Sequence, residues 1–345
     1  MRCSSRAILI SAAPRRCADV ETGTRYLEVY LAPLAGLLAR TDVTDVLINR
    51  PGEAWIETLN GTIERVECPE LDATQLWHLA RQVAALSHQG ISRAHPLLAA
   101  TLPDGARVQI VAPPATRGDM AIAFRKHLAP DRTLGDYVAD GAFAGAALST
   151  GIAAPPPVLQ PASDSPDDLA LFLSDMIRAR RNVLISGGTS TGKTTFLNAL
   201  MREIPAHERL VLIEDTAEIA LGHANAVGLL AVKGELGEAR VSADDLLQAA
   251  LRMRPDRIVV GELRGSEAYT FLRAINTGHP GSLSTIHADS PEGAIEQLAL
   301  IILQTGTQLR REDIVAYVNA TVDVIVQLER RDGVRRISAI MLTRG

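Results

Sequence analysis

Apolar and polar residues alternate with two different spacings in the first third of the chain. Apolar residues three or four positions apart predict helices, and strict alternation around a Pro-Gly turn predicts paired strands. The expected elements are, in order, a helix at 26–38, strands around 43–48 and 55–56, a helix at 72–86, and strands at 107–112 and 120–125. This mixture predicts an N-terminal α+β domain over residues 25–127.

A proline-rich stretch separates this region from a second one. Pro155, Pro156, Pro157 and Pro161 favour an extended linker over residues 128–166, with one short helix around Leu134 to Phe143. From residue 167 to 345, short apolar runs alternate with segments of helical spacing, which predicts a mostly parallel sheet with helices on both faces. The expected order is helix 167–181, NVLIS, helix 194–201, RLVLIE, helix 242–253, RIVVGE, helix 266–275, SLSTIHA, helix 291–304 and a hairpin around Asp332-Gly333.

The composition is that of a folded globular chain. Its 345 residues suggest about two domains, and 47% apolar with 22% charged residues argues against global disorder. Residues 1–24 carry a basic end and a short apolar run, and we expect a flexible arm rather than a signal peptide. The longest apolar runs are too short or too often interrupted by Gly and Pro to cross a membrane.

Charge and cysteine content exclude several classes of function. A net charge of −5 and an aromatic content of 3% argue against a protein that mainly coats nucleic acid. We therefore expect no sequence-specific nucleic-acid binding. Cys3, Cys17 and Cys68 form neither a paired disulfide framework nor a C-x-x-C metal site, which is typical of a reducing compartment such as the cytoplasm.

A glycine-rich loop between a predicted strand and a predicted helix has the pattern G-x-x-x-x-G-K-[ST]. Such a loop wraps its backbone N–H groups around phosphate oxygens, and the helix N-terminus adds its positive end. Lys193 would reach the β- and γ-phosphates of ATP, and the Thr194 hydroxyl would ligate Mg²⁺. The predicted nucleotide-binding residues are Gly187, Gly188, Thr189, Ser190, Thr191, Gly192, Lys193, Thr194 and Thr195.

Acidic residues end two of the predicted strands. RIVVGE delivers Glu262 to the carboxyl end of a strand, where a carboxylate can orient and deprotonate an attacking water. The preceding position, an Asp in many P-loop enzymes, is Gly261, so another carboxylate is needed near Mg²⁺. RLVLIEDTAEI supplies Glu214, Asp215 and Glu218 at the end of its strand, and we count Glu218 among the catalytic candidates; a structural role such as capping is the alternative.

Two histidines flank the last predicted parallel strand. His287 follows this strand and His279 precedes it, and either could sense the γ-phosphate, with His287 the favoured candidate. Without a third ligand the pair does not predict a zinc site.

Four segments, GGTSTGKTT, IEDTAE, LRMRPDRIVVGELRGSEAY and TGHPGSLSTIHADS, resemble in order the Walker A, acidic, Walker B and histidine boxes of the secretion traffic ATPases. Within this type II/IV secretion superfamily the motifs are most similar to the type IV secretion and conjugative DNA-transfer ATPase. LINRPGEAWIE and LPDGARVQI extend the similarity into the first domain. The resemblance implies an N-terminal domain above a RecA-like C-terminal domain, a homo-hexamer, and nucleotide between the domains.

The resemblance also implies partners and further site residues. Arg107 and Arg125 match the arginines of the N-terminal domain that close on the phosphates in this family. ATP and Mg²⁺ are the implied cofactors, and inner-membrane proteins of a secretion channel are the implied partners. They would hold the protein peripherally at the cytoplasmic face of the inner membrane.

The sequence therefore predicts an ATP-hydrolysing hexameric motor that drives DNA or protein transfer, or pilus assembly, through a type IV secretion system. A pilus or tight-adherence assembly or retraction ATPase remains an alternative. The type II assembly branch is disfavoured because no cysteine follows Cys68 to build its zinc insertion. Two further alternatives are a RecA-like nucleic-acid translocase and a nucleotide-gated scaffold without turnover.

Overall fold

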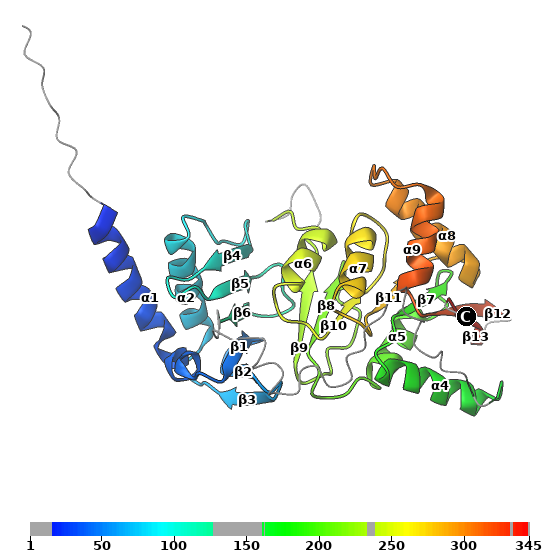
Figure 1. The fold of residues 1–345 in the computed structure, drawn as a ribbon, viewed down its shortest axis with the longest axis horizontal. Coiled ribbons are helices and arrows are strands. Elements are labelled where there is room, and N and C mark those ends of the chain that lie inside the picture. Colours follow the sequence, from blue (N-terminus) through cyan, green and yellow to red (C-terminus); the bar gives the residue numbers. More distant parts are fainter. Residues whose placement is uncertain (1–15, 127–160, 162, 233–238, 332–333, 344–345) are drawn as a thin grey trace, which may run out of the picture.

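The computed structural model describes residues 16–126, 161, 163–232, 239–331 and 334–343. Two sheets, each with its own helices, lie side by side (Figure 1). The last strand of the first sheet ends at Arg125 and the first helix of the second unit begins at Pro166, on either side of the predicted linker. The short helix expected around Leu134 to Phe143 lies outside the described residues.

The N-terminal domain is an antiparallel sheet covered by two helices on one face. Sheet order is β3-β2-β1-β6-β5-β4, and α1 and α2 pack on the face that points away from the C-terminal domain (Figure 1). Its elements are α1 (Arg16–Ala39), β1 (Val43–Ile48), β2 (Glu53–Thr58), β3 (Ile63–Glu67), α2 (Ala73–Leu86), β4 (Leu97–Thr101), β5 (Arg107–Val111) and β6 (Ala121–Arg125). The predicted helices and strands of this domain are confirmed, and β3 and β4 are additional.

Helix α1 is longer than its apolar pattern predicted. It begins at Arg16, so residues 16–24, which we expected in the flexible arm 1–24, are helical. No proline lies between Pro14 and Pro33, and the leucine-bearing part of the helix packs in the N-terminal core. Once that part is anchored, adding residues at its N-terminal side needs no new nucleation.

The C-terminal domain is a seven-stranded sheet with helices on both faces. Sheet order is β13-β12-β7-β11-β10-β8-β9; all neighbouring pairs are parallel except the terminal hairpin β12–β13. Its elements are α4 (Pro166–Arg178), β7 (Val183–Gly187), α5 (Lys193–Met201), β8 (Leu210–Glu214), β9 (Ala226–Leu230), α6 (Ala243–Ala250), β10 (Arg257–Val260), α7 (Glu267–Asn276), β11 (Leu283–Ile286), α8 (Pro291–Leu303), α9 (Arg311–Thr321), β12 (Val324–Arg331) and β13 (Val334–Leu342).

Alternate residues of these strands feed two separate cores. Val183 and Ile185 of β7 pack with α4 and α5 on one face, whereas Leu184 packs with α6, α7, α8 and α9 on the other. This pattern explains why the strands are largely apolar: both faces of a sheet with helices on each side are buried. The predicted alternation is confirmed here, and β9 and α9 are additional.

The two domains meet at strand β9, on the outer edge of the C-terminal sheet. Residues 113–119, between β5 and β6, run along β9: Leu230 N–H donates to Ala115 O at 3.0 Å, and Arg117 N–H donates to Gly228 O at 3.1 Å. Behind this junction, Arg209 Nη1 donates to Asn49 Oδ1 at 2.7 Å, and Arg254 pairs with Glu57 at 2.5 Å. The N-terminal domain is thus joined to the C-terminal sheet by backbone and side-chain hydrogen bonds.

Within the described residues, none of the helices has both the length and the apolar character needed to cross a membrane.

Candidate functional site

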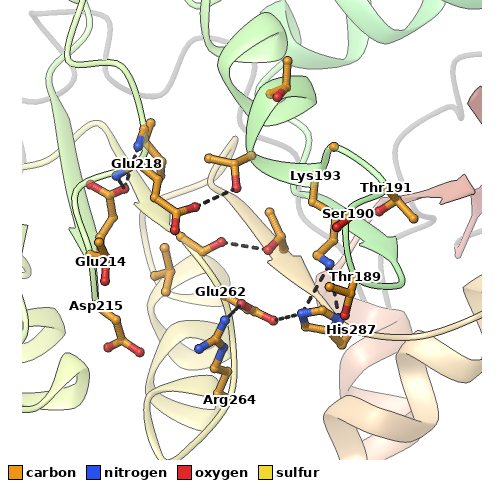
Figure 2. A pocket seen from close by; sticks show the side chains of 18 of the residues that line it. Thr189, Ser190, Thr191, Lys193, Glu214, Asp215, Glu218, Glu262, Arg264 and His287 are labelled. Carbon is orange, nitrogen blue, oxygen red and sulfur yellow. Dashed lines mark hydrogen bonds and ion pairs between the residues drawn. The ribbon is translucent and has the colours of Figure 1, made fainter. Parts of the chain in front are cut away.

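A cavity of about 520 Å³ opens at the carboxyl ends of β7, β8, β10 and β11 (Figure 2). Parallel sheets place ligands at this edge because the loops that follow the strands converge there. The glycine-rich loop, the acidic residues after β8 and β10, and His287 after β11 all line the cavity. The structure therefore brings these predicted residues together around one space.

The loop between β7 and α5 has a backbone shaped for phosphate oxygens. Ser190 and Gly192 adopt positive φ angles of 62° and 92°. Gly187 is needed for packing, because a Cβ there would lie 2.6 Å from Thr191 Oγ1 and 2.8 Å from Leu328 O. Helix α5 begins at Lys193 with no side-chain cap, so its first N–H groups are left for an anion.

Lys193 is largely buried beneath this loop. Its ammonium donates to the carbonyl oxygens of Gly187 at 2.8 Å and Gly188 at 3.0 Å. Burial lowers the pKa of Lys193, while the nearby Glu262 carboxylate opposes that shift. The loop thus folds around a cation that can turn toward a phosphate group.

The acidic loop after β8 faces the start of α5. Glu218 Oε2 lies 3.4 Å from Thr194 Oγ1, within reach of its hydroxyl proton (Figure 2). Glu214 itself is buried and stabilises the turn: its Oε1 accepts the N–H groups of Glu218 at 2.9 Å and Ile219 at 2.7 Å. Glu214 therefore stabilises the turn in this arrangement, and Glu218 and Asp215 are the carboxylates of this loop that remain to face the cavity.

Glu262, just after β10, contacts the side chains of Arg264 and His287. Its Oε1 lies 2.9 Å from His287 Nε2, and its Oε2 pairs with Arg264 (Figure 2). Both ring nitrogens of His287 lie 3.4 Å from Lys193 Nζ. Lys193, Glu262 and His287, which come from three different segments, thus form one cluster.

Gly261 leaves room for the acidic loop. A Cβ at this position would lie 3.2 Å from Glu214 Cγ and 3.6 Å from Ile213 O. Any side chain here would therefore need the Glu214 side chain to shift by a few tenths of an ångström. The position before Glu262, an Asp in many P-loop enzymes, thus carries no acid here, and Asp215 and Glu218 after the neighbouring strand line the same cavity.

The second histidine lies away from the cavity. His279 precedes β11, whereas His287 follows it, so they lie at opposite ends of the strand. His279 Nδ1 lies 3.0 Å from the Pro255 carbonyl oxygen, and burial lowers the pKa of its imidazole. Of the two histidines, only His287 is placed to contact a nucleotide in this structure.

The two predicted arginines lie away from the cavity that the glycine-rich loop lines. Arg107 and Arg125 face each other across β5 and β6 and line a second cavity of about 600 Å³ together with Leu251 and Arg252. The structure therefore brings Arg107 and Arg125 together but does not bring them to the glycine-rich loop.

Two arginines that line the cavity, Arg264 and Arg335, were missed from the sequence. Arg264 contacts Glu262, and Arg335, on β13, donates from Nε to Ser190 O at 3.1 Å. Arg264 lies two residues after Glu262 and could have been considered with it. Arg335 had no local signal, because it reaches the loop only through the pairing of the C-terminal hairpin with β7.

The residues present fit a magnesium–nucleotide. The uncapped start of α5 and Lys193 match phosphate oxygens, and the cavity is large enough for a nucleotide's phosphates. The Thr194 hydroxyl and the Glu218 and Asp215 carboxylates are oxygen ligands of the kind that Mg²⁺ prefers. Within the described residues no His, Cys, Asp or Glu group of three or more could hold a metal by itself, so the phosphates would have to complete the coordination.

The chain matches a known protein family over most of its length. Residues 29–334 match the family described as Type II/IV secretion system protein. The chain belongs to this family. The type IV secretion system protein VirB11 of Bartonella quintana is 34% identical over 332 residues, covering 90% of this chain and 91% of VirB11. The type IV secretion system protein PtlH of Bordetella pertussis is 39% identical over 328 residues, covering 93% of this chain and 94% of PtlH.

A solved structure agrees with this assignment. The crystal structure of the VirB11 ATPase from the Brucella suis type IV secretion system, in complex with sulphate, superimposes with a TM-score of 0.85 at 36% identity. The match covers 94% of this chain and 96% of that one. The predicted fold class and the predicted resemblance to type IV secretion ATPases are thereby confirmed.

Proposed function

We propose that this protein is an ATP-hydrolysing motor of a type IV secretion system. The observation that carries the proposal is the cluster of Lys193, Glu262 and His287 beside the phosphate-binding loop. Membership of the secretion family and similarity to VirB11 and PtlH over most of the chain support it.

The loop and Lys193 would bind the nucleotide. The N–H groups at the start of α5 would donate to phosphate oxygens, and Lys193 would exchange its two carbonyl partners for the β- and γ-phosphates. Magnesium, when bound, supplies positive charge that neutralises the phosphate oxygens, with Thr194 and Glu218 as its protein-side oxygen donors. His287 would sense the γ-phosphate through its contacts with Lys193 and Glu262.

Glu262 would activate the attacking water. Its carboxylate is in contact with Arg264 and His287, so it is held in one orientation beside the cavity. A γ-phosphate would compete with Glu262 for Arg264, because a guanidinium matches phosphate oxygens as well as it matches a carboxylate. The released carboxylate oxygen would then accept the proton of the water.

We further propose that the motor is a homo-hexamer attached through channel proteins to the cytoplasmic face of an inner membrane. Arg107 and Arg125, which line a different cavity in the single chain, would reach the phosphates only after the N-terminal domain moves or from a neighbouring copy. A ring follows from a heterologous interface that closes by rotation. Mass measurement with ATP and Mg²⁺ tests the number of subunits.

Steady-state phosphate release with two active-site variants tests the chemistry. Lys193→Ala should bind ATP weakly, and Glu262→Gln should bind ATP but lose at least about 100-fold in kcat, the usual contribution of a positioned base. Glu296→Gln is the matched control, because Glu296 pairs with Arg311 on the exposed surface of α8. Wild-type rates in Lys193→Ala and Glu262→Gln would refute the proposal, and strong stimulation by single-stranded DNA would favour a nucleic-acid translocase.

A further inference from the structure

Arg117 crosses from the N-terminal domain to the acidic loop of the C-terminal domain. Its backbone is fixed along β9, where its N–H donates to Gly228 O and the preceding residue, Thr116, pairs with Leu229. Its Nη1 donates to the carbonyl oxygen of Ile219 at 2.6 Å, and its Nη2 forms an ion pair with Glu214. One side chain therefore links segment 113–119 to both ends of the turn that carries Glu218.

The ion pair between Arg117 and Glu214 is buried, and a glycine beside it makes room for the Arg117 side chain. The side chain of Arg117 is 14% exposed and that of Glu214 is 3% exposed. Burial lowers the pKa of Arg117, which means that the cation is held at a cost that its partners must offset. Gly228 makes the path possible, because a Cβ at that position would lie 2.5 Å from Arg117 Cδ.

Glu214 connects Arg117 with the turn that carries Glu218. Arg117 contacts Glu214 Oε2, whereas Oε1 of the same carboxylate accepts the N–H groups of Glu218 and Ile219. Those two bonds orient the turn from which Glu218 faces Thr194 at 3.4 Å. Without Arg117, the buried Glu214 carboxylate would lose its cationic partner and the Ile219 carbonyl would lose its donor.

We infer that Arg117 is a positioning residue through which the N-terminal domain places Glu218 beside Thr194. A movement of segment 113–119 along β9 withdraws Arg117 from Glu214 and loosens the turn at Glu218. The carboxylate at the magnesium side of the cavity is then set by the position of the N-terminal domain. This inference rests on the proposed function for the role of magnesium, but not for the coupling between Arg117 and the turn.

Amide hydrogen exchange on the full-length protein without nucleotide tests the coupling directly. In Arg117→Ala, exchange at the N–H groups of Glu218 and Ile219 should rise at least about tenfold, because a hydrogen bond of about 1.5 kcal/mol or more is weakened. Exchange in β7 should not change. Arg50→Ala is the matched control: Arg50 is an exposed arginine of the same domain, paired with Glu53, and should leave the turn unaffected. Arg117→Lys, which can hold one of the two partners, should give an intermediate value.

Gly228→Ala provides a second route to the same effect without removing a charge. Its Cβ must displace the Arg117 side chain, so the turn should exchange as fast as in Arg117→Ala. Unchanged exchange at Glu218 and Ile219 in both variants would overturn the inference. An equal increase across the whole C-terminal domain would also overturn it, since it would reveal only a general loss of stability.

Binding of a fluorescent ATP analogue, with and without Mg²⁺, tests the consequence at the cavity. Arg117→Ala should reduce the enhancement of affinity by Mg²⁺ about three- to tenfold, and should have no further effect when Glu218→Gln is already present. Equal loss in both backgrounds would show that Arg117 does not act through Glu218 and would overturn the inference. A wild-type protein that binds no nucleotide would refute the proposed function, whereas the exchange measurement would still decide the role of Arg117.

Discussion

Arg257, at the start of β10, forms a buried two-pronged ion pair with Glu208. Its Nε and Nη2 donate to the two carboxylate oxygens at 2.6 and 2.9 Å, and its Nη1 donates to Ile177 O at 2.7 Å. The Arg257 side chain is fully buried, so Arg257→Met leaves the buried Glu208 carboxylate with only the partly exposed Arg180 as a cationic partner. We expect this variant to lose about 3–5 kcal/mol of unfolding free energy, the cost of breaking a buried pair on one side.

Removing both charges should cost less than removing either one. Glu208→Leu leaves the buried guanidinium unpaired and should also lose about 3–5 kcal/mol, so additive effects would give about 6–10 kcal/mol. The double variant leaves the carbonyl oxygen of Gly281 without the Nη1 donor of Arg257, which costs about 1–3 kcal/mol, whereas the carbonyl oxygen of Ile177 keeps the N–H of Arg180. Arg180, the other partner of Glu208, is 39% exposed and can be hydrated.

Urea unfolding followed by far-UV circular dichroism measures these differences. Tryptophan fluorescence in the same samples gives an internal comparison, because both tryptophans, Trp55 and Trp77, lie in the N-terminal domain. Arg311→Met is the matched control: its partner Glu296 is exposed, and such pairs contribute at most about 1 kcal/mol. A loss below about 1 kcal/mol in Arg257→Met, or a double variant that equals the sum of the singles, would refute the reasoning.

Two further predictions concern the histidine outside the cavity and the arginine inside it. Burial lowers the pKa of His279 from its ordinary value of 6.5, so the unfolded chain takes up this proton first as the pH falls. The stability that neutral His279 contributes is complete above pH 6.5 and declines below it. Between pH 7 and pH 5, His279→Asn should therefore lose less unfolding free energy than wild type in urea titrations. An identical loss in both proteins would contradict this prediction. Arg335→Ala should weaken binding of a fluorescent ATP analogue about 2- to 10-fold through its lost contact with Ser190, with kcat within about twofold of wild type; a large fall in kcat would instead place Arg335 in the chemistry.

Local patterns were sufficient to predict the core of the C-terminal domain. The apolar run of β7, the glycine-rich loop and the helix that follows are adjacent in sequence, so the strand, the loop and Lys193 could be placed together before the structure was known. Glu262 could be predicted in the same way, because a carboxylate directly after a buried parallel strand must lie at the ligand-binding edge.

Elements that depend on distant partners could not be predicted. Strand β9 contains Gly228 and has only weak strand character by itself; it forms between β8 and segment 113–119. Helix α9 was also missed, although six of its eleven residues are apolar and its buried side chains, Ile314, Val318 and Thr321, stand four and three positions apart. In β9 the local propensity is weak and tertiary packing decides the structure, whereas in α9 the helical spacing is present in the sequence and was overlooked.

The residues of the candidate site that belong to local motifs could be predicted, whereas those contributed by remote segments could not. Arg335 and Arg117 come from a hairpin and a loop that are remote in sequence from the residues they contact, so neither has a local motif. Arg107 and Arg125 were correctly predicted to lie on strands, and these strands pair so that the two residues are opposite each other. Their distance from the glycine-rich loop depends on how the two domains pack, which the strand pattern does not determine.

Segment 113–119 also protects the outer edge of the C-terminal sheet. A strand at a sheet edge carries unpaired N–H and C=O groups that can pair with another chain, and natural proteins cover such edges. In this protein the N-terminal domain covers β9, whose Val227 and Leu229 share a core with Ala115 and Ala121 of the N-terminal domain. A truncated protein that begins after the linker would expose both the edge and this apolar surface. Self-association of the isolated C-terminal domain is the expected consequence, so the two domains depend on each other for solubility as well as for the site.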